Sequence, residues 1–270
     1  MAAPELFELE LFGEGIEKRY RKMRPEVEAM PWGTLSLEGL DETQIVAARK
    51  SWTGAAFQEH RTAIACAATL RALLEARAPL DLIALASRFP LDELVHVELC
   101  ARMAMELGGG TELVHDPDLL IVDALEEHTP LMRAADLVVR FFCVGEALSI
   151  PLLRGTWRAA QHPLPRAVLG RIVKDEAAHG TFGFAFLDWA GPRLSKSDRE
   201  LLGAQADRVI RVIQQQWDTI REGGSRTVRE GDPLAWMSSN AYLALAEKSM
   251  RERVVRPLLQ RDIPVSAHPG

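Results

Sequence analysis

The sequence predicts an all-α fold, and three observations lead to this prediction. Long stretches rich in alanine and leucine place apolar residues at helical spacing. Capping-box patterns and prolines occur where these stretches begin, and glycines or prolines occur where they end. After residue 40, no alternation of apolar and polar residues is long enough to predict a strand. With 270 residues, 47% of them hydrophobic, the chain can bury the core of one large helical domain.

The first two helical segments follow a lead-in over residues 1–40, where short apolar pieces alternate with glycines and prolines. A capping box, Asp41 to Gln44, predicts the start of a long helix that ends before Pro79. The second segment spans about 80–107, with an interruption expected at Pro90. Three consecutive glycines predict its end.

Four more helical segments are predicted downstream. The third, about 130–157, is hydrophobic nearly all round in its middle, so neighbouring helices should bury it. The fourth spans about 165–189. A capping box at Ser197 to Glu200 predicts a fifth segment reaching about residue 222, and Asp232 with Pro233 predicts a sixth reaching about residue 259.

Composition excludes several classes of function. The formal net charge of -6 leaves no broad basic surface, so nucleic acid is not an expected partner. The acidic N-terminus does not resemble a signal peptide, and no segment is apolar enough to span a bilayer, which predicts a cytoplasmic protein with no membrane partner. The cysteines, Cys66, Cys100 and Cys143, are widely spaced and are expected to be reduced, buried thiols.

Two copies of one motif provide the strongest functional signal. "DELVH" at residues 92–96 and "DEAAH" at residues 175–179 each place a glutamate and a histidine one helical turn apart on the same face. Among 7 histidines and 38 acidic residues, about one such pair is expected by chance, so a single copy is weak evidence for a metal site. The repetition, including the preceding aspartate, favours a site built from both helices.

Two further carboxylates complete the pattern. Glu146 is isolated in an apolar helix, where a carboxylate is costly to bury unless it is paired or bound to a cation. The first helix offers Glu59, with Glu75 as an alternative closer to the helix end. The spacings from Glu59 to Glu93 and from Glu146 to Glu176 fit two antiparallel hairpins. The longer interval between the hairpins predicts a crossover between the second and third helical segments.

The order Glu, Glu-x-x-His, Glu, Glu-x-x-His resembles the ferritin-like carboxylate-bridged diiron superfamily over about residues 42–190. The resemblance implies a ferritin-like four-helix bundle at 41–191, with 1–40 packed on it and 192–270 as a helical extension of the same domain. It also implies that Glu93 and Glu176 bridge the metals and that Asp92 and Asp175 orient the histidines. The implied metal ligands are Glu59, Glu93 and His96 at one iron, and Glu146, Glu176 and His179 at the other.

The implied activity is that of a diiron oxidase or oxygenase. Two iron ions would activate O2 to oxidise an organic small molecule, although manganese or a mixed pair remains open. A separate electron donor is expected because no flavin, nicotinamide or iron–sulfur motif occurs. The alternatives are a manganese or iron protein that detoxifies peroxide or handles metal, and a helical scaffold with a structural polar core. The last two helical segments could form a pocket wall or the surface of a homodimer.

The sequence departs from several branches of the superfamily. His179 is absent from classical ferritin centres, and the Cys-x-x-Cys pairs of rubrerythrins are missing here. Demethoxyubiquinone hydroxylases have tyrosines where this chain has Cys66 and Leu153, and arylamine N-oxygenases have a histidine where it has Ile172. Small residues around Glu59 predict either a substrate cavity or tight packing. The remaining histidines are expected to be exposed: His60, His115, His128, His162 and His268.

Overall fold

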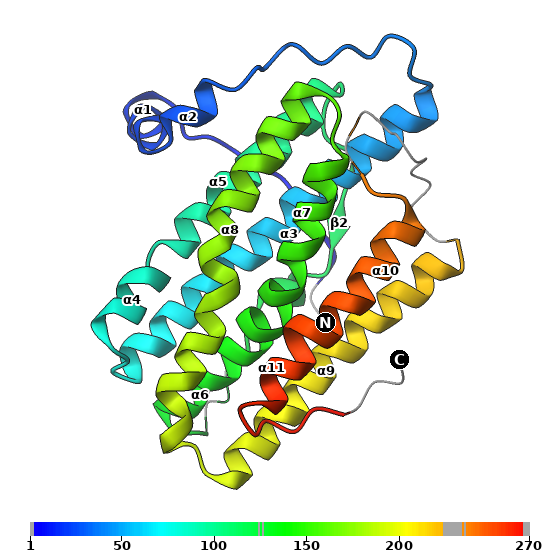
Figure 1. The fold of residues 1–270 in the computed structure, drawn as a ribbon. Helices are drawn as coiled ribbons and strands as arrows, with labels where there is room; N and C mark the ends of the chain where they lie inside the picture. Colours follow the sequence, from blue (N-terminus) through cyan, green and yellow to red (C-terminus); the bar gives the residue numbers. More distant parts are fainter. Residues whose placement is uncertain (1–2, 124, 126, 224–233, 235, 267–270) are drawn as a thin grey trace.

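The structure, a computed structural model, describes residues 3–123, 125, 127–223, 234 and 236–266. It is mostly helical, which confirms the all-α prediction (Figure 1). In these ranges the only strands are β1, Glu5–Leu6, and β2, Val114–His115, which pair antiparallel. This short ladder ties the N-terminal segment to the connection between α5, Phe89–Glu106, and α6, Pro130–Leu137.

The N-terminal lead-in contains α1, Glu14–Met23, and α2, Pro25–Glu28. Arg24, between them, is only 1% exposed and pairs with Glu28 at 2.6 Å and with Glu98 of α5 at 2.7 Å. A buried guanidinium needs such partners because its desolvation is otherwise unfavourable. The lead-in is therefore anchored to α5, and the chain then crosses to the start of α3 (Figure 1).

Helix α3, Glu42–Glu75, begins at the predicted capping box. The backbone N–H of Gln44 donates to the Asp41 carboxylate at 2.8 Å, while the backbone N–H of Asp41 donates to the side-chain oxygen of Gln44 at 3.1 Å. Both bonds satisfy N–H groups that a helix start leaves without partners. The prediction for this helix start is confirmed.

The second predicted segment is two helices, α4, Leu80–Ala86, and α5, Phe89–Glu106. The interruption lies at residues 87–88, just before Pro90 rather than at it. Pro90 occupies the first turn of α5, where a missing N–H group leaves no helical hydrogen bond unmade.

The third segment combines α6, Pro130–Leu137, the π-helical segment η2, Val138–Glu146, and α7, Ala147–Ala159. Sequence reasoning did not predict the π-helical geometry. Such segments often occur at functional sites, and this one ends at Glu146. Helix α8, Pro163–Ala190, packs along both η2 and α7.

The C-terminal helices begin with α9, Lys196–Arg221. Its capping box is Ser195 with Asp198, not Ser197 with Glu200: the Asp198 N–H donates to Ser195 Oγ, and the Ser195 N–H donates to Asp198 Oδ2. The predicted start at Asp232 and Pro233 lies outside the described residues. The helical part that follows comprises α10, Ser239–Ser249, the π-helical segment η4, Met250–Val255, and α11, Arg256–Leu259.

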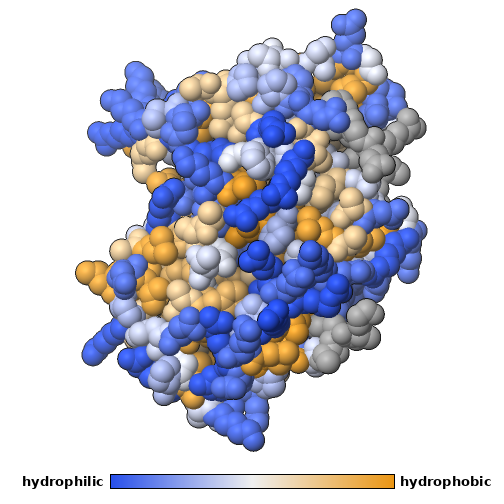
Figure 2. Space-filling view, in the orientation of Figure 1, coloured by the Kyte–Doolittle hydropathy of each residue, from blue (hydrophilic) through white to orange (hydrophobic). Residues whose placement is uncertain are grey.

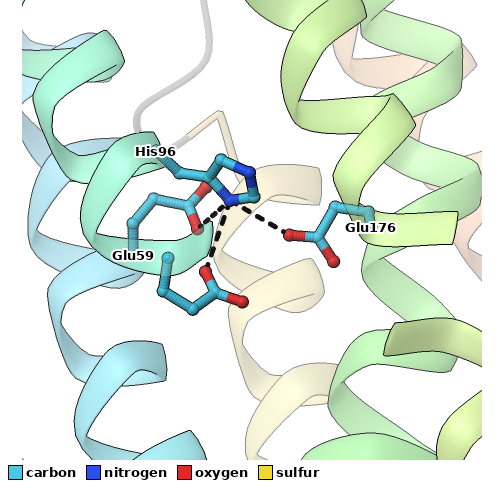
Figure 3. A group of neighbouring side chains, drawn as sticks. Glu59, His96 and Glu176 are labelled. Atoms are coloured by element: carbon cyan, nitrogen blue, oxygen red, sulfur yellow. Dashed lines mark ion pairs between the residues drawn. The ribbon is translucent and has the colours of Figure 1, made fainter. Parts of the chain in front are cut away.

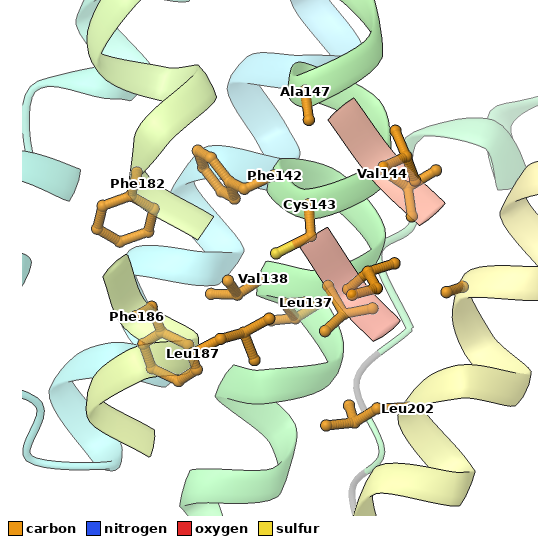
Figure 4. Packing of buried hydrophobic residues seen from close by; sticks show 14 of the residues in the cluster. Leu137, Val138, Phe142, Cys143, Val144, Ala147, Phe182, Phe186, Leu187 and Leu202 are labelled. Atoms are coloured by element: carbon orange, nitrogen blue, oxygen red, sulfur yellow. The ribbon is translucent and has the colours of Figure 1, made fainter. Parts of the chain in front are cut away.

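Aromatic packing between α5, η2 and α8 forms part of the core. The rings of Phe89, Phe142 and Phe182 lie 5.0–5.5 Å apart between centroids. Figure 4 shows Phe142 and Phe182 on facing segments. Gly183 permits this approach, because a Cβ atom there would lie 2.7 Å from Cys143 Sγ and 3.0 Å from its backbone nitrogen. The Phe89 ring also lies 4.1 Å from the His179 ring, so this cluster packs directly against the candidate site.

Candidate metal centre

Six acidic and histidine side chains from four helical segments come together in the core. Helix α3 supplies one, α5 two, the end of η2 one and α8 two. They form two groups, and within each group the ligand atoms lie within 4.8 Å of one another. Glu93 and Glu176 belong to both groups and therefore lie between them. The groups are Glu59, Glu93, His96 and Glu176, and Glu93, Glu146, Glu176 and His179.

The six side chains are largely removed from solvent. The side chains of Glu93, His96 and His179 have 0% exposure, and that of Glu176 has 3%. Glu146 is 7% exposed as a residue, while the Glu59 side chain is 15% exposed and is the most accessible of the set. Glu59 is therefore the candidate ligand with the most contact with solvent.

Both histidines direct Nδ1 at the carboxylates. His96 Nδ1 lies 3.3 Å from Glu176 Oε1 and 3.4 Å from Glu93 Oε2, with Glu59 Oε2 at 3.7 Å. Figure 3 shows the side chains of Glu59 and Glu176 converging on the His96 ring. His179 Nδ1 lies 3.0 Å from Glu93 Oε1 and 3.2 Å from Glu176 Oε2. The Nδ1 atoms are therefore the inward-facing donors.

The outward ring nitrogens face the two aspartates in a crossed arrangement. His96 Nε2, on α5, lies 3.3 Å from Asp175 Oδ2 on α8, and His179 Nε2, on α8, lies 3.7 Å from Asp92 Oδ2 on α5. Each aspartate precedes its glutamate by one residue, which turns it about 100° around the helix toward the neighbouring helix. Asp175 thus forms a hydrogen bond with the histidine of the other motif, whereas His179 Nε2 has Asp92 as a nearby charge but is buried without a hydrogen-bond partner.

Two arginines hold these aspartates, and sequence reasoning missed both. Arg88 Nε lies 3.0 Å from Asp92 Oδ2, and Arg171 Nε lies 2.6 Å from Asp175 Oδ2. Burial opposes the charge of Asp175, but the bonds from His96 and Arg171 hold the pKa of this carboxyl below its usual value. The available signal was spacing, because each arginine precedes its aspartate by one helical turn.

The chemistry of the unpaired atoms fits a cation. Among the described residues, His96 Nδ1, His179 Nδ1 and both carboxylate oxygens of Glu93 are buried without a hydrogen-bond partner. A buried polar atom left in this way costs about 1–3 kcal/mol, and more if it is charged. Metal–oxygen bonds of about 2.1 Å place ligand atoms up to about 4.2 Å apart across one ion. This span is comparable with the ligand-atom separations of up to 4.8 Å within each group. These buried groups could hold a metal ion.

Protons take up the negative charge when the carboxylates have no cation. Burial raises the pKa of Glu59 to about 8 and raises the pKa of Glu146 well above its usual value. Burial alone would lower the pKa of His179, but Asp92, Glu176 and Glu93 raise it to about 12. Because metal ligands must be deprotonated, these are protons that a bound cation would displace.

The alternative carboxylate lies apart from the candidate ligands, and none of the three cysteines belongs to the two donor groups. Glu75 pairs with Arg71 and Arg133, each at 2.9 Å, near the end of α3, so it does not replace Glu59. All three cysteines are buried and free. Burial, followed by the surrounding glutamates, raises the pKa of the Cys66 thiol well above its usual value. Cys66 therefore stays protonated and acts as a packing residue.

The predicted exposure of the other histidines holds only in part. His115 is buried and packs on Phe57, with ring centroids 4.8 Å apart, so that prediction was wrong. The pairing of β1 with β2 draws this segment onto α3, a long-range contact that local polarity does not reveal. His60 and His162 are partly buried and His128 is exposed. His268 lies outside the described residues.

The small residues beside Glu59 are mainly covered by neighbours: Ala56 and Ala63 are buried, and Ala55 and Thr62 are partly buried. Ala56 belongs to the hydrophobic core. At Ala56, therefore, the small side chain serves tight helix packing and does not line a cavity.

Comparison with known proteins finds no protein-family model that matches this sequence and no curated protein that matches it. Across the described residues, every helix is too short or too polar to cross a membrane. The assignment of the site therefore depends on its geometry and chemistry.

Proposed function

We propose that this chain is a ferritin-like, non-haem diiron protein that activates O2 to oxidise or oxygenate an organic small molecule. The observation that carries the proposal is the pair of overlapping donor groups with two inward-facing, unbonded imidazole nitrogens. Four carboxylates and two neutral imidazoles would balance the charge of two divalent cations. Oxygen and imidazole ligands suit iron or manganese better than metals that prefer thiolates.

The shared carboxylates support a centre with two ions rather than one. Glu59, Glu93 and His96 would hold one iron, and Glu146, Glu176 and His179 would hold the other. Glu93 and Glu176 would bridge them, because each belongs to both donor groups.

The surrounding residues would prepare the histidines and exclude water. Asp175 would keep the proton of His96 on Nε2, which leaves the Nδ1 lone pair free for a metal, and the charge of Asp92, 3.7 Å from His179 Nε2, would favour the same tautomer there. Phe89 and its aromatic neighbours close the side next to His179. The partly exposed Glu59 side remains for the entry of small reactants.

Bound ferrous ions would supply electrons and open coordination positions for the reaction of O2 with an organic substrate. A separate protein or small reductant would restore the ferrous state, because the sequence contains no recognisable flavin, nicotinamide or iron–sulfur motif.

The test begins with metal analysis of protein produced in iron- and manganese-replete medium. The proposal predicts two ions per chain, and the absence of both metals would contradict it. Ferrous protein is then mixed with O2, with and without panels of apolar acids and amines, while oxygen uptake and products are measured. We expect uptake that depends on one substrate class. Rapid breakdown of added hydrogen peroxide with no oxidised organic product would instead favour a peroxide-detoxifying protein.

A further inference from the structure

A groove of about 710 Å³ lies between α7, α8 and the helical part that runs from α10 through η4 to α11. Its floor includes Ala147, Ile150 and Ser249, all buried. Gly180 allows the Ile150 side chain to lie across α8, because a Cβ atom there would be 2.3 Å from Ile150 Cδ1. The volume falls in the range of small-molecule sites, roughly 300–1,000 Å³. The groove is thus large enough for a medium-sized organic molecule.

The rim of this groove is basic although the chain as a whole is acidic. Four exposed cationic side chains line it, and none of them has an ion pair with another described residue. Of the two carboxylates in the lining, Asp188 is already paired with Arg261 at 2.7 Å, which leaves Glu252. The local excess of positive charge contrasts with the net charge of -6. The four cations are Arg154, Arg158, Lys248 and Arg253.

Apolar and basic surfaces meet in the same hollow. Ile150, Phe184 and Leu245 offer hydrocarbon and aromatic surface within the lining, while Arg154 and Lys248 stand on α7 and α10. In the orientation of Figure 1, Figure 2 shows strongly hydrophilic side chains over the region of α7, α8 and α10, with hydrophobic atoms between them. This combination matches a molecule with an apolar body and an anionic head.

We propose that this groove is a binding site for an organic anion with an apolar body, such as a carboxylate or phosphate that carries a hydrocarbon chain. The proposal concerns binding alone and does not depend on the proposed oxidation. A hollow with a buried floor favours a small molecule over the broad, flat surface of a protein partner. Ala147 and Ala177 follow Glu146 and Glu176 by one residue and therefore line the groove from other faces of the helices, whereas Ile150 and Gly180, one turn beyond the same glutamates, form the part of the groove nearest the metal centre.

The test compares octanoate, octyl phosphate and octylammonium, which share an apolar body but differ in head group. Isothermal titration calorimetry of the full chain should show one site per chain for at least one anion, bound at least tenfold more tightly than octylammonium. The comparison between the two anions identifies the preferred head group. Equal affinity for the cation and both anions would overturn the proposal, because the basic rim would then have no role.

Variants distinguish this groove from the metal centre, to which a carboxylate could also bind. The double variant Arg154→Gln/Lys248→Gln should weaken binding of the preferred anion at least tenfold, and Thr181→Trp should block the groove. Thr181 is exposed, so the bulky side chain does not enter the core. Arg211→Gln, at an exposed position on α9, is the matched control and should bind the anion as tightly as wild type does. Unchanged anion binding in both groove variants would contradict the proposal.

Discussion

Replacing Glu146 with glutamine should change the stability of this protein in a metal-dependent way. Glu146 is buried, and burial with the nearby charges of Glu176 and Glu93 raises its pKa well above the usual value. Without metal its neutral form is therefore favoured, and the amide of Glu146→Gln resembles this neutral acid in size and polarity. We expect the metal-free variant to unfold within about 1 kcal/mol of wild type.

With metal present, the same substitution removes one anionic ligand. Free metal at 100 times its dissociation constant stabilises a one-site protein by about 2.7 kcal/mol. If the substitution weakens affinity about 100-fold, the same metal concentration stabilises the variant by only about 0.4 kcal/mol. The expected loss of stabilisation, treated as one site, is therefore about 2.3 kcal/mol.

Urea unfolding at 25 °C with Mn²⁺, and separately with chelator, measures both quantities. Glu112→Gln, an exposed change in the connection between α5 and α6, is the control and should respond to Mn²⁺ as wild type does. Equal stabilisation of wild type and Glu146→Gln by Mn²⁺ would refute the reasoning. A large destabilisation of the metal-free variant would show instead that Glu146 has a structural role.

Three further outcomes are expected. Arg171→Gln removes the 2.6 Å ion pair with Asp175 and should weaken metal affinity about 10- to 100-fold, measured by chelator competition. The control Lys174→Gln should leave metal affinity unchanged. Equal losses of affinity in the two variants would contradict an orienting role for Arg171. Gly183→Ala should destabilise the protein by about 1–3 kcal/mol, because the added methyl group would collide with η2. Gly54→Ala, at an open helical position, should instead stabilise it by up to about 1 kcal/mol. Thermal unfolding that ranks the two variants in the reverse order would refute the packing argument. The hydrogen bond from Arg24 lowers the pKa of Glu28 from 4.5 to about 2. The ionised Glu28 carboxylate therefore stabilises the fold above pH 4.5, and this contribution is lost as the pH falls toward 2. The difference in unfolding free energy between chelated wild type and Glu28→Gln should shrink over that interval, and a constant difference would argue against the ion pair.

Local sequence patterns predicted most of the helices and the residues of the candidate site. The pairs Glu93 with His96 and Glu176 with His179 were recognisable because a three-residue spacing places them on one helix face. Glu146 was recognisable because an isolated acid in an apolar helix requires compensation. The structure brings these residues together with Glu59.

Other features depend on contacts that the linear pattern does not specify. The π-helical geometry of η2 has no evident local signal in a segment that is apolar nearly all round. The start of α9 was misplaced because Ser195 and Ser197 both offer a capping hydroxyl followed three residues later by an acid. The crossed pairing of Asp92 and Asp175 with the histidines appears only when α5 and α8 face each other.

Anomalous diffraction at the iron edge, from crystals of protein loaded anaerobically with ferrous iron, tests the metal assignment most directly. Two peaks per chain are predicted between Glu93 and Glu176, one bonded to His96 Nδ1 and the other to His179 Nδ1. The absence of iron from these side chains, or coordination through the Nε2 atoms, would contradict the account.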